Sequence, residues 1–355
     1  MTWLPSNSTV NHAFRLSKPG FLGQMGKRLR PSCVHPRYRH DSLSDATTTT
    51  TSTPTVQPQK IALVMGVANQ RSIAWACVEA FLAQNYNVII THQERFQDKV
   101  AKLVENTRQS NNSNNNETTV TAQIVGHTPC NVESDLPLLF EEQIPEMIHA
   151  HHDQQQQQQQ SPSSSMSTEP SRIHAIAHCI AFGDLQAPLR TVDWQTFSQA
   201  QHISAFSFLE TAQCASRSLH LLAPTGVSMT ALSYLGAVRA VQPYHVMGPA
   251  KASLESLVRG MALEFATPHD DEASSPCPPF RVNAVSAGPI ATLSARGGIG
   301  GFSNLQQSVS KASPLGRPVS PKEVAETVAW LSESTGITGQ IIYVDGGYSS
   351  IVPTQ

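Results

Sequence analysis

The feature that most constrains the fold is an alternation of short apolar runs with longer amphipathic runs from residue 60 onward. Strands are expected at 61–66, 87–92, 119–125, 172–182, 226–233, 280–288 and 340–347, and helices at 73–84, 194–220, from about 244, and at 321–332. Strands that are apolar on both faces are typical of a parallel sheet covered by helices on each side. The sequence therefore predicts an α/β fold with a single doubly wound parallel sheet.

Right-handed crossovers bring the loops after the strand carboxyl ends to one edge of such a sheet, where ligands bind. The first of these loops is GVANQRS, residues 66–72. Gly66 suits a tight turn, small Ala68 allows close approach of a ligand, and Ser72 suits a helix cap beside an anion. Such turns also arise for purely structural reasons. The position after the first strand favours a dinucleotide pyrophosphate site, as in a Rossmann-like domain.

The end of the second expected strand carries Gln93. Nucleotide-binding sheets often have an acidic residue there to bind the adenosine ribose, and a neutral amide can bond the same hydroxyls. Gln93 offers no cation to a 2′-phosphate, which favours NADH. Arg95, two residues later, keeps NADPH as an alternative.

A second glycine-rich run, residues 296–304, follows no expected strand and opens no obvious helix. A phosphate site is therefore not expected in it. Gly297, Gly298, Gly300 and Gly301 fit either a mobile flap over the active site or an ordinary flexible loop.

Residues 1–59 differ in composition from the rest of the chain. Residues 1–40 contain no Asp or Glu but carry seven basic residues, at positions 15, 18, 27, 28, 30, 37 and 39. This is typical of an organellar transit peptide, of a plastid or a mitochondrion, and a disordered basic tail is the alternative. The Thr-rich stretch before residue 60 suits a linker, which leaves one folded domain at 60–355.

Three polar, low-complexity segments interrupt that domain, at about 106–119, 149–171 and 267–279. They contain too few apolar residues to offset the entropy lost on ordering, so surface insertions are expected. His149, His151 and His152 precede a polyglutamine run, and a solvated loop is a better interpretation than a metal site.

Several classes of protein are disfavoured by composition. The six cysteines include no C-x-x-C pair, which favours reduced thiols over a zinc site or a disulfide framework. No stretch approaches the roughly 20 apolar residues of a membrane span. The net charge of -2 gives no electrostatic bias toward nucleic acid.

Tyr244 and Lys251 form the main candidate for catalysis. Seven residues on a helix turn through about 700°, so both side chains would project from one face. An ammonium beside a tyrosine lowers the pKa of its hydroxyl and can also hold a sugar hydroxyl. Such a pair can stabilise or protonate an oxyanion, although Tyr and Lys at this spacing are also common on surface helices.

Longer runs around this pair resemble a known family. They are TALSYLGAVRAVQPYHVMGPAKASLESLVRGMALEF, GVANQRSIAWA, RVNAVSAGPIATLSA and ITGQIIYVDGGY. Together they resemble the short-chain dehydrogenase/reductase superfamily and, within it, the bacterial-type NADH-dependent enoyl-[acyl-carrier-protein] reductases. Most of the superfamily has Tyr-x-x-x-Lys, which would require lysine at Gly248. The longer spacing to Lys251, with Tyr234 ten residues upstream of Tyr244, is specific to the enoyl reductases.

The resemblance implies reduction of trans-2-enoyl thioesters on acyl carrier protein in type II fatty-acid synthesis, by a homotetramer. Tyr244, Lys251 and Tyr234 would be catalytic. The implied cofactor contacts are Gly66, Ala68, Ser72, Ile73, Gln93, Asn131, Val132, Cys179, Ile180, Ala181, Lys251, Ile290 and Thr292. The implied substrate contacts are Gly183, Tyr234, Tyr244, Met247 and Phe302.

The chain departs from the family at four of its positions. Asn131 replaces the usual Asp but can still accept a hydrogen bond from adenine. Cys179 and Ala181 replace the usual Ser and Gly beside the cofactor, which would tighten the pocket. Pro249 lies between Tyr244 and Lys251, and is interpreted as an early-helix residue, where proline is tolerated.

Two rival functions remain. Another short-chain reductase acting on a ketone or alcohol would usually have serine at position 231, where this chain has Ala231. A non-catalytic NAD-binding protein would not need Tyr244 and Lys251.

Overall fold

The computed structural model describes residues 60–114, 122–158, 171–266, 277–292 and 301–352. All of them belong to one compact unit, Pro54–Gln355. The expected leader and linker at 1–59, most of the glycine-rich run and most of the third expected insertion lie outside the described residues.

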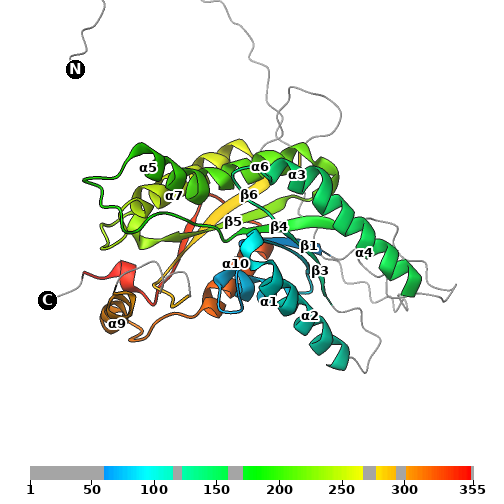
Figure 1. The fold of residues 1–355 in the computed structure, drawn as a ribbon, viewed down its shortest axis with the longest axis horizontal. Coiled ribbons are helices and arrows are strands. Elements are labelled where there is room, and N and C mark those ends of the chain that lie inside the picture. Colours follow the sequence, from blue (N-terminus) through cyan, green and yellow to red (C-terminus); the bar gives the residue numbers. More distant parts are fainter. Residues whose placement is uncertain (1–59, 115–121, 159–170, 267–276, 293–300, 353–355) are drawn as a thin grey trace, which may run out of the picture. The chain divides into compact units, whose positions relative to one another are not determined.

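The described residues contain a parallel sheet of seven strands in the order β3-β2-β1-β4-β5-β6-β7. Figure 1 shows helices on both of its faces, so the predicted doubly wound, Rossmann-like fold is confirmed. The strands are β1 Lys60–Met65, β2 Asn87–His92, β3 Ile124–Pro129, β4 Arg172–His178, β5 Val227–Tyr234, β6 Phe280–Ala287 and β7 Ile341–Val344.

The register brings the carboxyl ends of the central strands to one level. Met65 of β1 pairs with Thr91 of β2 on one side and with His178 of β4 on the other. His178 in turn pairs with Ala231 of β5. The residues that follow these positions therefore meet at one edge of the sheet, as parallel pairing requires.

Two helical layers cover the sheet (Figure 1). One apolar core is shared with the helices α1 Ile73–Ala83, α2 Gln97–Asn114 and α10 Pro321–Glu333. The opposite core is shared with α3 Leu136–Leu138, α6 Ser207–Arg217 and α7 Met247–Glu264. The helices α4 Ile144–Gln158 and α5 Trp194–Gln201 lie in this second layer, while α9 Phe302–Ala312 lies near the C-terminal end.

Short irregular helices complete the chain. The π-helical segments η2 Leu139–Gln143 and η3 His202–Phe206 join α3 to α4 and α5 to α6. The 3-10 helices are η1 Glu94–Phe96, η4 Leu219–Leu221, η5 Leu235–Ala237 and η6 Tyr348–Ser350.

The structure differs from the local predictions at three places. The third strand is Ile124–Pro129 rather than 119–125, and α2 runs through the Asn-rich segment to Asn114. Similarly, α4 runs through the histidine cluster, so the loop predicted there is a helix. An established helix adds polar residues at little cost per residue, because nucleation is the expensive step.

The histidine cluster is part of the packed structure. His151 is buried, and its Nε2 lies 3.3 Å from Nδ2 of Asn87, while Nε2 of His152 accepts a hydrogen bond from the Ser171 N–H. Among the described residues, no group of three or more His, Cys, Asp or Glu side chains is placed to hold a metal ion. None of the helices in the described ranges is long and apolar enough to cross a membrane.

Candidate active site

The loop after β1 is shaped by Gly66, which has φ +89° and lies against the loop after β4. A β-carbon at Gly66 would lie 2.7 Å from the carbonyl oxygen of Cys179 and 2.8 Å from Cγ1 of Ile180. Any side chain would collide there, so glycine is required. The structure thus brings together three of the predicted cofactor residues.

Ser72 caps α1, as the sequence predicts. Its hydroxyl accepts a hydrogen bond from the Trp75 N–H at 3.1 Å and donates to the Asn69 carbonyl at 2.7 Å. Ile73 is the first residue of α1, and Ala68 lies half-buried in the loop before it. The N-terminus of α1 therefore opens at the ligand edge of the sheet, which suits a pyrophosphate.

The predicted adenosine-binding residues follow β2 and β3. These two strands are joined at their ends by a 2.8 Å hydrogen bond from the Cys130 N–H to the His92 carbonyl. Gln93 and Asn131 are exposed, whereas Val132 is buried. The amide oxygen of Asn131 accepts from the Glu133 N–H at 3.2 Å, so it also stabilises its own turn.

Lys251 lies inside α7 with its side chain beneath the end of β5. It is 3% exposed, and its Nζ donates to the Leu232 carbonyl at 2.7 Å. Burial lowers the pKa of Lys251 to about 8, and electrostatic interactions with Cys179 and Glu255 oppose this effect. The interaction with Cys179 places the Lys251 ammonium beside the predicted cofactor site.

Tyr244 and Tyr234 are in ring contact, with centroids 4.8 Å apart. Tyr244 precedes α7, which begins at Met247, so the prediction that Tyr244 and Lys251 share one helical face is wrong. Pro249 explains this difference, because it has no N–H to continue the helix back toward residue 245. Pro249 is the third residue of α7, and its interpretation as an early-helix residue is confirmed.

The pKa of Tyr244 also differs from expectation. Burial raises it above its ordinary value, and the nearby Tyr234 and Glu255 add to the effect. The prediction that Lys251 lowers the pKa of Tyr244 is therefore wrong. Burial, followed by the charge of Tyr348, raises the pKa of Tyr234 to about 12. Both hydroxyls consequently keep their protons at neutral pH.

A cavity of about 80 Å³ adjoins Tyr234. It is lined by Tyr234, Leu235, Arg239, Ala240, Val241, Leu305, Val309, Tyr348 and Ile351. Phe302 was predicted to line the acyl pocket, but it is 4% exposed and is not part of this lining. The residues of α9 that line this cavity are Leu305 and Val309, which lie about one and two turns beyond Phe302 along the helix.

Gly183 and Met247, which were also predicted to contact the substrate, lie together elsewhere. A β-carbon at Gly183 would lie 2.6 Å from Sδ of Met247. Ser204 supports this arrangement, since its hydroxyl donates to the Phe182 carbonyl at 2.8 Å and lies 3.7 Å from the same sulfur. Ala181 is exposed beside this loop.

Ile290 and Thr292 follow β6. Ile290 is buried, and its carbonyl accepts from the Thr292 N–H at 2.8 Å. Gln306 of α9 donates to the neighbouring Pro289 carbonyl at 3.1 Å. This bond connects α9 to the end of the sheet that carries the predicted cofactor residues.

Comparisons with known proteins indicate the family of this chain. The family model described as "Enoyl-(Acyl carrier protein) reductase" matches residues 141–349. A curated enoyl-[acyl-carrier-protein] reductase [NADH] FabI of Nostoc sp. is 35% identical over 298 residues, covering 81% of this chain and 96% of the relative. This chain belongs to the enoyl-[acyl-carrier-protein] reductase family.

Other family members differ in coenzyme. The FabI of Staphylococcus aureus strain MRSA252, named as an NADPH enzyme, is 32% identical over 82% of this chain and 97% of its own length. The crystal structure of the Bacillus cereus enzyme with NADP+ and indole naphthyridinone has a TM-score of 0.64 and 32% identity, covering 83% of this chain and 98% of that one. The family alone therefore does not fix the coenzyme.

Three residues that support this family site were not among those predicted from the sequence: Glu255, Ser233 and Gly236. Glu255 is 4% exposed, and its carboxylate accepts a 2.5 Å hydrogen bond from the Ser233 hydroxyl. Gly236 lies directly against the Tyr244 ring. Glu255 could have been noticed because it lies one helical turn beyond Lys251, on the same face. Burial raises the pKa of Glu255, and Ser233, Arg259 and Lys251 oppose that effect.

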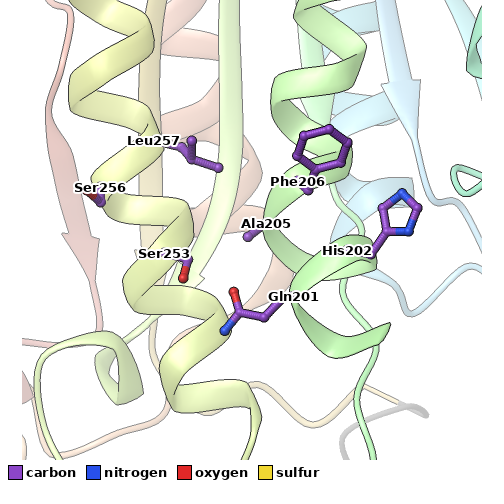
Figure 2. A pocket seen from close by; sticks show the side chains of 7 residues that line it. All are labelled: Gln201, His202, Ala205, Phe206, Ser253, Ser256 and Leu257. Atoms are coloured by element: carbon purple, nitrogen blue, oxygen red, sulfur yellow. The ribbon is translucent and has the colours of Figure 1, made fainter. Parts of the chain in front are cut away.

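A larger hollow of about 560 Å³ lies between η3 and α7 (Figure 2). Gln201, His202, Ala205, Phe206, Ser253, Ser256 and Leu257 line it. None of the predicted site residues is among them. Lys251 and Glu255 are buried on the opposite side of α7, so this hollow is separate from the reductase site.

Proposed function

We propose that this chain is an NADH-dependent reductase of trans-2-enoyl thioesters carried on acyl carrier protein, acting in type II fatty-acid synthesis. The observation that carries the proposal is the contact between Tyr234 and Tyr244 at the ligand edge of the sheet. Lys251 is buried at the same edge, beside Cys179. Curated relatives with this named activity, such as the Nostoc enzyme, support it.

The residues at the edge of the sheet fit a dinucleotide. Gly66 leaves open the space that a side chain would fill, and α1 presents its N-terminus there. Gly66, Ser72 and Ile73 would hold the pyrophosphate, and Lys251 the nicotinamide ribose. When bound, the nicotinamide supplies a hydride for C3 of the acyl chain.

Tyr244 and Lys251 then stabilise the negative charge that develops on the thioester oxygen. Tyr244 keeps its proton and can donate a hydrogen bond to this oxygen. Lys251 would hold the nicotinamide ribose, and its buried ammonium would contribute positive charge. The resulting enolate becomes the product when C2 is protonated.

NADH is the proposed coenzyme because Gln93 offers no positive charge to a 2′-phosphate. Arg95 is the nearby cation, and its guanidinium lies 4.8 Å from the centre of the Phe96 ring. Comparing kcat/KM with NADH and NADPH in wild type and Arg95→Ala tests this choice. A preference for NADPH that disappears in the variant would overturn it.

The activity is tested by following NADH absorbance with crotonyl and acetoacetyl thioesters in parallel. We expect turnover of the crotonyl substrate only, and a large loss in both Tyr244→Phe and Lys251→Ala. Tyr343→Phe is a matched control, because Tyr343 is 40% exposed on the edge strand β7. Unchanged turnover in both site variants would refute the assignment, and acetoacetyl turnover would indicate a ketone reductase.

A homotetramer is also proposed. The hollow between η3 and α7 carries Phe206, which is 44% exposed, and Trp194 of α5 is 77% exposed. Exposed aromatic groups of this kind are enriched at protein interfaces. Light scattering of wild type and Phe206→Glu tests this. A monomeric wild-type protein would contradict the proposal.

An organellar location is proposed from the composition of residues 1–59. Fusing these residues to a fluorescent protein tests import, with plastid and mitochondrion as the two alternatives. A fusion with the seven basic residues changed to glutamine is the control. Cytosolic fluorescence of the unaltered fusion would contradict an import signal.

A further inference from the structure

Two cysteines meet at the predicted cofactor site. The sulfurs of Cys77 on α1 and Cys179 after β4 are 4.0 Å apart. Cys77 is fully buried, whereas Cys179 is partly exposed at the ligand edge of the sheet. A small reagent can therefore reach Cys179 but not Cys77.

The surroundings give the two sulfurs different chemical roles. Cys179 is among the groups that raise the pKa of Lys251, so Cys179 lies within electrostatic reach of a buried ammonium. Cys77 differs, because its hydrogen bond with Cys179, together with burial, raises the pKa of the Cys77 thiol well above normal. A partly exposed cysteine near a cation, with a second thiol 4.0 Å away, is an arrangement found at redox-sensitive cysteines.

We propose that Cys77 and Cys179 are a modification site, a thiol pair that hydrogen peroxide converts to a disulfide. In the first step the Cys179 sulfur attacks the peroxide, the O–O bond breaks, and a sulfenic acid and one water form. In the second step the Cys77 sulfur attacks the sulfenic sulfur, the S–S bond forms, and a second water leaves. Two thiols thus lose two electrons and two protons, and the peroxide is reduced to two waters.

The disulfide would disturb the cofactor site. An S–S bond is about 2.05 Å long, so the sulfurs must move together by about 2 Å. The Cys179 backbone has little freedom to follow, because its N–H donates to the Met65 carbonyl at 3.1 Å and its carbonyl oxygen lies against Gly66. The oxidised chain should therefore bind the dinucleotide more weakly. A bound dinucleotide should in turn cover Cys179 and slow its oxidation. These two consequences rest on the proposed function, whereas disulfide formation does not.

Peptide mass mapping of the full chain after treatment with hydrogen peroxide tests the proposal. We expect a peptide linked through Cys77 and Cys179 that dithiothreitol dissociates. In Cys77→Ala we expect the linked peptide to be absent and a sulfenic acid at Cys179 to react with dimedone. Cys214→Ala, which removes another buried thiol, should form the link at the wild-type rate. Oxidation of other cysteines without a link between 77 and 179 would overturn the proposal.

NADH binding, followed by fluorescence, separates this proposal from the proposed function. We expect peroxide to weaken binding by about tenfold or more in wild type, with recovery in dithiothreitol, and to leave Cys77→Ala less affected. NADH added first should slow formation of the link. A link that forms while NADH neither binds nor protects would support the thiol pair and refute the reductase. NADH binding and turnover without any link would support the reductase and refute the thiol pair.

Discussion

Gly236 and Tyr244 are in direct contact, in an arrangement that leaves no space for a side chain at position 236. A β-carbon there would lie 2.6 Å from Cε1 of Tyr244 and 3.3 Å from Cδ1 of Tyr234. Gly236 belongs to η5, which directly follows β5, while Tyr244 lies in the turn before α7. Gly236 therefore fixes the position of the proposed catalytic tyrosine.

Gly236→Ala should displace the Tyr244 ring and reduce turnover. A displacement of about 1 Å at a reacting group can lower the rate by about 100-fold. NADH binding should change little, because Lys251 and Gly66 are not in contact with the new methyl group. Stopped-flow turnover of crotonyl thioester and NADH fluorescence titration together check this. An equal loss in kcat and NADH affinity would indicate general misfolding instead.

Gly260→Ala is a second glycine substitution, which should stabilise the protein instead of disturbing the site. Gly260 lies in α7, and a β-carbon there would meet no heavy atom within 4 Å. Replacing an exposed glycine inside a helix by alanine should raise the free energy of unfolding by about 0.5–1 kcal/mol. Urea unfolding measures this change. A destabilised variant would show that the helix is packed more tightly at this position than the structure indicates.

The pH dependence of the reaction should follow Lys251. Its pKa of about 8 is lower than its ordinary value, so the ammonium is present below about pH 8 and is lost as the pH rises through that value. The raised pKa of Tyr244 keeps that hydroxyl protonated over the same range. We expect kcat/KM to fall above about pH 8, mainly through weaker NADH binding. A flat profile to pH 10 would contradict this role.

Glu255→Gln should move the fall in kcat/KM to lower pH. The Glu255 carboxylate is one of the negative groups that raise the pKa of Lys251, so removing its charge lowers this pKa. Ser233→Ala is the control, because it removes the hydrogen bond to Glu255 but keeps the carboxylate. The pH profile of kcat/KM should shift in Glu255→Gln only. The same shift in both variants would indicate a structural disturbance.

The sequence predicts the sheet and its ligand edge well because both depend on local signals. Apolar runs of six to eight residues identify strands, and the glycine and serine of the first loop identify the turn and the helix cap. The structure brings Gly66, Cys179 and Ile180 together as expected. The parallel pairing of the strands is sufficient to explain this result.

Other features depend on tertiary contacts that no local pattern encodes. Glu255 resembles an ordinary helical glutamate in the sequence, and only its packing against Ser233 makes it part of the site. The lining of the cavity by Leu305 and not by Phe302 depends on where along its length α9 meets the cavity, which is set by the tertiary packing of the helix. Helix α2 likewise continues to Asn114 because extending a helix into a polar run costs much less than nucleating one there.

Pro249 allows a test of where α7 begins. As the third residue of the helix it replaces an N–H that has no partner within the helix, and the first bond is from the Ala250 N–H to the Val246 carbonyl at 3.2 Å. Pro249→Ala should therefore lower the free energy of unfolding by at most about 1 kcal/mol, through greater freedom of the unfolded chain. NADH binding should be retained, because Lys251 keeps its bond to Leu232.

Ser256→Pro is the contrasting variant for this test, since Ser256 is exposed within the interior of the same helix. A proline there removes a helical hydrogen bond and clashes with the preceding turn, which costs about 3 kcal/mol or more. Urea unfolding of the two variants should therefore differ by about 2 kcal/mol or more. A rise of about 3 kcal/mol in the free energy of unfolding of Pro249→Ala would instead show that Pro249 is a helix-interior residue and that α7 extends back past Met247. In that case Tyr244 would lie on the helix after all.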